Sequence, residues 1–209
     1  MTEKERNRIY SSVGIGWSSA GIRDSVEATV TRAAPPPAGV LLTAIVSRTG
    51  EVTDGSVIEV LDPAWREISR IIQHNPRELL SLTPNQWEEL VAASYDKAGF
   101  DEVILTPRSG DFGRDVIAVK HGWGSIRIID QVKAFQPGHL VTANDVRALL
   151  GVLQSDRNAT KGIVTTTSDF APRIKDDPFI SPFCPFRLEL VNGQELFGRL
   201  SKLGPAGAT

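Results

Sequence analysis

The spacing of apolar residues changes near residue 83 and divides the chain into two parts. Before it, two β-branched runs flank the turn-prone sequence RTGEVTDGS, which predicts a β-hairpin at 40–61. A helix up to Pro76 is predicted next from four apolar residues at helical spacing: Trp65, Ile68, Ile71 and Ile72. Pro76 is well placed to begin another short helix. The first 35 residues are rich in Gly, Ser and Pro, and 22–33 is compatible with a strand or a short helix.

From Thr83 onward, helical and strand patterns alternate. Thr83 and Gln86 form a capping-box signature for a helix that runs to about Ala98. Thr142 and Asp145 open a second helix. Strand patterns occur at 102–106, 115–120, 125–133, 161–167 and 186–193, and a short final helix follows at 194–203. This order predicts an α/β domain built on a mixed β-sheet flanked by helices, preceded by a small N-terminal α+β extension.

Composition is that of an ordinary globular protein, with 41% hydrophobic and 23% charged residues. No run of 18 apolar residues is present and the N-terminus lacks the apolar core of a signal peptide, so we expect a cytoplasmic protein without a membrane span. Cys184 is the only cysteine, which excludes an internal disulfide and a cysteine-rich zinc site. The net charge of -2 gives no global attraction to nucleic acid, so a nucleic-acid enzyme of this composition must concentrate its basic residues locally.

The chemistry of the chain concentrates at the end of the strand IDQVK. Side chains alternate along a strand, so Gln131 and Lys133 share one face while Val132 points to the other. If 115–120 and 125–133 pair as a hairpin, Asp115 lies near both polar residues. A carboxylate, an amide oxygen and an ammonium group then meet at one sheet edge. Such oxygen ligands suit Mg²⁺ or Mn²⁺, and the lysine would stabilise an attacking hydroxide or a phosphate transition state.

The helix that begins after Thr83 offers a further carboxylate. On a helical wheel, Glu88 falls at the edge of the apolar stripe beside Tyr95, whereas Glu89 falls nearly opposite that stripe. Glu88 is therefore expected to look toward the sheet and Glu89 to be solvated. Solvation at the helix edge is an equally good interpretation of Glu88.

Four segments, taken in order, resemble the Mrr family of restriction endonucleases, which belongs to the PD-(D/E)XK nuclease superfamily. They are LTPNQWEELVAASYDKAGF, TPRSGDFGRDVIAV, IIDQVKAF and GIVTTTSDFAP, and the resemblance covers about 83–192. The family commonly carries Gln-x-Lys in place of Asp/Glu-x-Lys. Each segment alone is weak, since an aspartate followed by Gln-x-Lys is common by chance, but their order and spacing are specific.

The resemblance implies a restriction-endonuclease-like fold and assigns roles by position. The metal-binding aspartate would be Asp115, the Gln-x-Lys pair Gln131 and Lys133, and the helix glutamate Glu88. Together with Asp115 and Gln131, the backbone carbonyl of Val132 would hold the metal. The nucleophilic hydroxide would be oriented or stabilised by Lys133.

The turn before Asp115 departs from the family pattern. The family usually has DGGxD where this chain has DFGRD, so Phe112 and Arg114 differ. Phe112 would restrict the turn or touch a substrate, and Asp111 is more readily a structural turn residue than a group supporting the metal site. A phosphate-contacting rim is expected from four basic residues, among which Arg114 is favoured because it adjoins Asp115: Arg108, Arg114, Lys120 and Arg127.

The resemblance therefore implies a Mg²⁺-dependent (or Mn²⁺-dependent) DNA endonuclease in restriction or antiphage defence. We expect a nuclease domain at 81–202, a flexible tail at 203–209, and an extension at 1–80 for recognition, dimerisation or docking. The partners would be DNA and a second copy of the chain or another defence protein. A catalytically idle nucleic-acid-binding or assembly module, or a nuclease of RNA or branched DNA, stays open.

Overall fold

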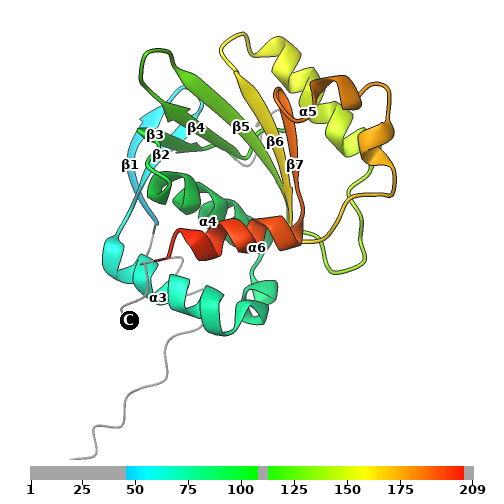
Figure 1. Ribbon diagram of the computed structural model, residues 1–209. Helices are drawn as coiled ribbons and strands as arrows, with labels where there is room; N and C mark the ends of the chain where they lie inside the picture. Colours follow the sequence, from blue (N-terminus) through cyan, green and yellow to red (C-terminus); the bar gives the residue numbers. More distant parts are fainter. Residues whose placement is uncertain (1–45, 108–112, 205–209) are drawn as a thin grey trace, which may run out of the picture. The chain divides into compact units, whose positions relative to one another are not determined.

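A mixed seven-stranded sheet, in the order β1-β2-β3-β4-β5-β6-β7, forms the centre of the computed structural model, which describes residues 46–107 and 113–204 (Figure 1). Neighbouring strands from β1 to β5 are antiparallel, whereas β5, β6 and β7 are parallel. The strands are β1 Val46–Val52, β2 Gly55–Val60, β3 Glu102–Leu105, β4 Val116–Lys120, β5 Ile126–Lys133, β6 Lys161–Thr166 and β7 Leu188–Val191. The helices are α3 Asp62–His74, α4 Pro84–Lys97, α5 Ala143–Ser155 and α6 Gly193–Lys202, with 3-10 turns at Pro76–Ser81, Ile174–Asp176 and Ser181–Phe183.

Helices cover both faces of the sheet. One core lies between the sheet and α3, α4 and α6, and it receives Val132 and Ile128 from β5 (Figure 1). A second core lies under α5 on the opposite face and receives Ile129. Alternation along β5 therefore places Val132 in the core of α4, as expected, and turns Gln131 and Lys133 toward the face of α5.

The local signals in the sequence are confirmed. Both capping boxes form, with the hydroxyls of Thr83 and Thr142 accepting from the backbone N–H groups of Gln86 and Asp145. The predicted hairpin is present as β1 and β2, although residues 40–45 and the segment 22–33 lie outside the described part of the chain. The element at Pro76 is a 3-10 turn.

The hairpin and the helix of Trp65 pack on the main domain. β2 hydrogen-bonds β3, so the described part of the extension continues the central sheet. The indole N–H of Trp65 donates to the carbonyl of Leu203 (3.1 Å), which ties α3 to the end of α6. Only glycine fits at Gly55, because a Cβ there would lie 2.1 Å from the carbonyl oxygen of Leu105. The two elements therefore pack on the main domain, as expected of elements too small to be stable alone.

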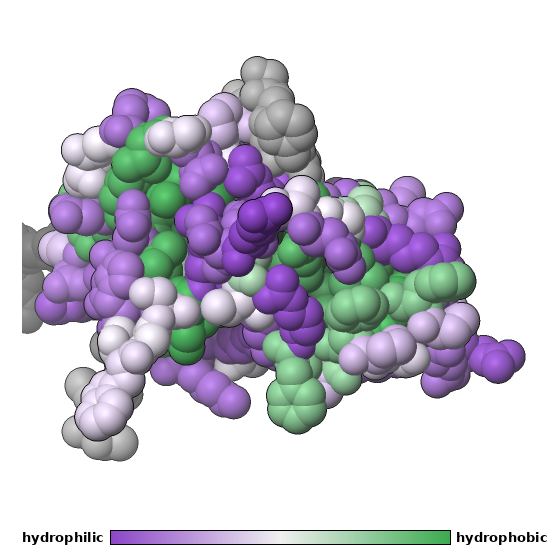
Figure 2. Space-filling view, turned by 90° about the horizontal axis from the view of Figure 1, so that it is seen from above, coloured by the Kyte–Doolittle hydropathy of each residue, from purple (hydrophilic) through white to green (hydrophobic). Residues whose placement is uncertain are grey.

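The surface seen from above is mixed in character, with apolar side chains between hydrophilic ones (Figure 2). Among the described residues, the most exposed large apolar side chains are Trp123, Phe186 and Phe179. Within the described residues, no helix has the length and apolarity needed to cross a membrane.

Candidate active site

Asp115 lies directly against the end of β5. Its backbone N–H donates to the carbonyl of Asp130 (3.1 Å), and its carbonyl accepts from the N–H of Thr106 on the other side (3.1 Å). Its side-chain Oδ2 accepts from the backbone N–H of Val132 (2.7 Å). The carboxylate therefore sits beside the Gln131–Lys133 segment, which is the juxtaposition that the sequence pattern predicted.

The carbonyl of Val132 is also placed toward Asp115. The N–H and C=O groups of one strand residue point to the same side of the strand, and the N–H of Val132 already points at the Asp115 carboxylate. The Asp115 carboxylate, just before β4, and the backbone carbonyl of Val132 in β5 are therefore on the same side of β5. This is the usual way in which two oxygen ligands reach one hard cation.

Gln131 contributes a buried amide to this corner. The residue is 7% exposed, and its Oε1 accepts no hydrogen bond from any residue that the structure describes. Its Nε2 lies next to Gly113, and a Cβ at Gly113 would lie 3.2 Å from this nitrogen. Gly113 also has φ +78°. A buried carbonyl-type oxygen without a donor is costly, so this atom fits a metal ligand better than a packed side chain.

Lys133 is held in place rather than left in solvent. Its Nζ lies 3.7 Å from Oδ1 of Asp145, and its side chain is 24% exposed. Burial raises the pKa of Asp145, but hydrogen bonds from Thr142 and the charge of Lys133 outweigh this and hold the pKa below its usual value. Asp145 thus stays ionised, caps α5 and keeps the ammonium group near the end of β5.

The donor set contains one carboxylate. In the ranges 46–107 and 113–204, no group of three or more His, Cys, Asp or Glu side chains is arranged to hold a metal ion. An ion at this corner would rest on Asp115 and two uncharged oxygens, from Gln131 and Val132. That set suits Mg²⁺ or Mn²⁺, which retain several waters, and does not suit zinc.

The two glutamates of α4 differ from expectation in one respect. Glu89, expected in solvent, is 24% exposed and lies 3.9 Å from the guanidinium of Arg48. The prediction for Glu89 was wrong because β1 brings a cation beside α4. Glu88 is half-buried. Since α4 packs on the face opposite Gln131, Glu88 would reach the site only around the end of the sheet, and its role stays a prediction.

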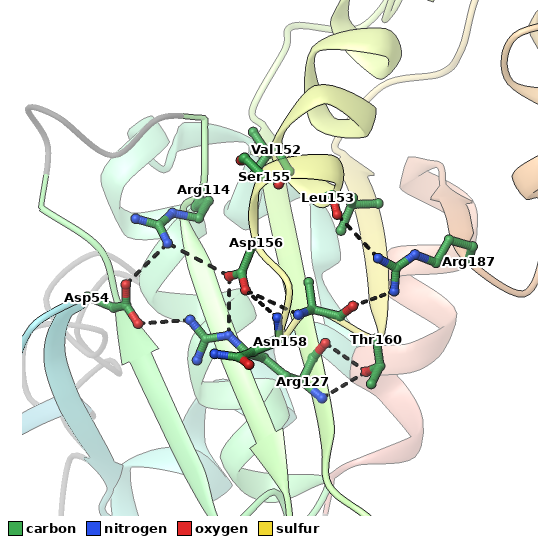
Figure 3. Close-up of polar contacts among 11 residues, drawn as sticks. Asp54, Arg114, Arg127, Val152, Leu153, Ser155, Asp156, Asn158, Thr160 and Arg187 are labelled. Atoms are coloured by element: carbon green, nitrogen blue, oxygen red, sulfur yellow. Dashed lines mark hydrogen bonds and ion pairs between the residues drawn. The ribbon is translucent and has the colours of Figure 1, made fainter.

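Two of the expected basic rim residues form an ion-pair network instead of an open rim (Figure 3). Asp54, in the turn of the β1-β2 hairpin, accepts from Arg114 at one oxygen (3.2 Å) and from Arg127 at the other (2.8 Å). Asp156, at the end of α5, lies 3.4 Å from Arg127 and 4.0 Å from Arg114. The network ties the residue before Asp115 to the hairpin and to α5.

One further member of that rim, Lys120, is separated from the site. Lys120 lies at the other end of β4 from Asp115 and pairs with Asp101 (3.0 Å), so it is not part of a rim there. Three candidates fall outside the described residues: Arg108, Asp111 and Phe112.

Asp130 is a polar residue whose importance the sequence analysis missed. It is 2% exposed on the face of α4, and its Oδ2 accepts from the hydroxyls of Tyr95 (2.8 Å) and Thr165 (2.9 Å). Burial raises the pKa of Asp130 to about 7, against the lowering effect of these two bonds. The signal was present in IRIIDQVK, where a carboxylate stands between Ile128 and Val132 on the core-facing side of the strand.

Comparison with known proteins shows the family. The Mrr catalytic family model, described as restriction endonuclease, matches residues 79–200. Similar solved structures are the MspJI restriction endonuclease in complex with a 27-mer oligonucleotide and the DNA modification-dependent restriction endonuclease AspBHI, each 16% identical with a TM-score of 0.42. They cover 66% and 68% of this chain, which spans 30% and 36% of theirs. No curated protein matches. The observed fold is a mixed sheet flanked by helices, and the chain belongs to the Mrr restriction endonuclease family.

Proposed function

We propose that this chain is a divalent-metal-dependent endonuclease that hydrolyses phosphodiester bonds in DNA. The observation that carries the proposal is the placement of Asp115 against β5, beside the buried amide oxygen of Gln131, which accepts from no described residue. Membership of the restriction endonuclease family supports DNA as the substrate.

In the proposed mechanism, Asp115, Gln131 and the carbonyl of Val132 hold the metal ion. When bound, the ion would neutralise charge on the scissile phosphate and lower the pKa of a water ligand. The N–H of Val132 fixes the rotamer of Asp115, and Asp145 pairs with Lys133 at the end of β5. Lys133 would then orient the attacking hydroxide and stabilise the charge that develops on the phosphate.

Glutamine in place of the usual acid changes the electrostatics of the site. Gln131 brings an oxygen but no charge, so Asp115 supplies the full negative charge of the proposed ligand set. Affinity for the ion should therefore be weaker than in a site with two carboxylates, because ligand charge tunes affinity for hard cations. We expect both Mg²⁺ and Mn²⁺ to support activity.

The biological role that we propose is restriction of foreign DNA or antiphage defence in the cytoplasm. A second copy of the chain, or a partner defence protein, would complete the functional assembly. The extension at 1–80 would serve recognition, dimerisation or docking. Family membership supports the restriction role.

Cleavage of end-labelled substrates tests the proposal. Duplex DNA, branched DNA, single-stranded RNA and a DNA duplex with EDTA are incubated with the full chain and Mg²⁺ or Mn²⁺. Cuts in duplex DNA that disappear with EDTA are expected. Cleavage confined to RNA or branched DNA would show that duplex DNA is not the substrate. DNA binding without any cleavage would favour the catalytically idle module.

The ion-pair network predicts a role for Asp54 at the active site. Asp54→Asn removes the charge that holds Arg114 and Arg127, so the residue before Asp115 loses an anchor. We expect the Mn²⁺ concentration for half-maximal cleavage to rise about fivefold, the scale of one partly exposed ion pair. The matched control is Glu89→Gln, which breaks another pair between the hairpin and the main domain, at Arg48. An equal shift in both variants would show that hairpin docking, rather than Arg114, is responsible.

A further inference from the structure

A cavity of about 390 Å³ lies on the face of the sheet opposite Gln131 and Lys133. It opens between the end of α4, the strands β5 to β7, and α6. Most of its wall is apolar, formed by Ala98, Phe100, Ile128, Ile163, Val191, Leu196 and Leu203. Both the volume and the apolar lining with a few polar groups are typical of small-molecule sites.

The polar floor of the cavity is incompletely paired. Asp130 lines the cavity, and its Oδ2 accepts from the hydroxyls of Tyr95 and Thr165. Its Oδ1 is buried and accepts nothing from any described residue. A carboxyl oxygen in this state is costly, so a bound group with an N–H donor would be favoured there.

The mouth of the cavity is positively charged. Lys161 and Arg199 both pair with Glu189, and Lys202 adds a third cation to the lining. Three cations at the mouth face one acid there, Glu189, while the second acid of the lining, Asp130, lies at the buried floor. The mouth therefore favours an anionic group, whereas the floor favours an N–H donor.

We propose that this cavity binds a free nucleotide, with the base between the apolar walls and the phosphate at the mouth. A nucleobase offers both a flat apolar surface and ring or exocyclic N–H groups for Asp130. The phosphate contacts Lys202 and the cations around Glu189. The nucleotide is free rather than part of the cleaved strand, because the cavity opens on the face away from Gln131 and Lys133.

Binding at this cavity would affect the position of Asp115 at the proposed metal site. The carbonyl of Asp130 accepts from the N–H of Asp115, so movement of β5 at Asp130 reaches Asp115 through one hydrogen bond. The nucleotide is thus placed to act as an effector of the site. Its binding does not depend on cleavage, and its test uses binding alone.

The test is calorimetric titration of the full chain with AMP, GMP, CMP and UMP in EDTA, so that no metal bridges phosphate to Asp115. We expect saturable one-to-one binding of at least one nucleotide, at least about tenfold tighter than its nucleoside or ribose 5-phosphate. Trp65 should report occupancy by a change in fluorescence, since its indole bonds to the carbonyl of Leu203, a wall residue. A short single-stranded oligonucleotide, titrated in parallel, should bind more weakly at this cavity.

Variants locate the binding. Asp130→Asn should weaken it about tenfold or more, the scale of a hydrogen bond to a charged group. Lys202→Gln, at an exposed position where folding is not at risk, should weaken it about threefold, whereas the control Lys175→Gln on an exposed turn should not. Failure of all four nucleotides to bind below about 1 mM, or binding unchanged by both Asp130→Asn and Lys202→Gln, would overturn the proposal. If the oligonucleotide binds more tightly than every nucleotide and Lys202→Gln weakens that binding, the ligand of the cavity is a nucleic-acid strand and not a free nucleotide.

Discussion

Replacing Lys133 with alanine is expected to slow DNA cleavage by about 100-fold or more while Mn²⁺ binding persists. The substitution removes the cation that we propose to act on the scissile phosphate but leaves Asp115, Gln131 and the carbonyl of Val132 unchanged. Loss of such an electrostatic contact typically costs on the order of 3 kcal/mol in the transition state. Single-turnover cleavage rates and calorimetric Mn²⁺ titration measure the two effects separately.

Lys120→Ala is the matched control for Lys133. It removes a cation from the neighbouring strand at the end far from Asp115, where Lys120 pairs with Asp101. Its cleavage rate should stay within about twofold of the native rate, the scale of an exposed ion pair. Equal losses in the two variants would mean that general charge, rather than the position of Lys133, drives the effect.

Asp115→Ala should abolish metal binding and cleavage together. Gln131 and the carbonyl of Val132 bring no charge, so removal of Asp115 leaves two neutral oxygens that cannot retain a divalent ion at millimolar concentration. Asp115→Asn keeps the acceptor for the N–H of Val132 and should lose the ion in the same way. Calorimetry with Mn²⁺ and the cleavage rate measure both losses.

The control for Asp115 is Asp101→Asn. The Asp101 carboxylate also accepts a backbone N–H, from His121, at the other end of β4. It should retain metal binding and cleavage. Metal binding that survives in Asp115→Ala would place the ion elsewhere.

Local signals in the sequence were sufficient for most elements. Thr83 and Thr142 each stand three residues before a side chain that completes a capping box, and both helices begin there. Alternation in IDQVK correctly separated Val132 from Gln131 and Lys133. These predictions depend on neighbours within a few residues, so the sequence contains the information directly.

Long-range pairings were not predictable in the same way. The union of β2 with β3 joins residues nearly 50 positions apart, and it brings Arg48 to Glu89 and Asp54 to Arg114. The periodicity of one segment carries no information about its contacts with a distant segment. The expectation for Glu89 failed for this reason, and the expected basic rim became an ion-pair network for the same reason.

Asp130 shows a different limit. Its position between two core-facing residues marks it as a buried carboxylate, but its partners Tyr95 and Thr165 are each 35 residues away in sequence. The strand pattern identifies the anomaly without showing what satisfies it. Sequence inspection of polar residues on core-facing strand positions would have raised Asp130 as a candidate.

In the proposed site, Asp115, Gln131 and the carbonyl of Val132 hold one divalent ion. Diffraction from crystals soaked in Mn²⁺, recorded at the manganese absorption edge, measures this directly. We expect one anomalous peak about 2 Å from a carboxylate oxygen of Asp115 and from the carbonyl oxygen of Val132, with the Gln131 amide oxygen beside it. A peak at another group of residues, or none at this corner while the crystals remain ordered in Mn²⁺, would contradict it.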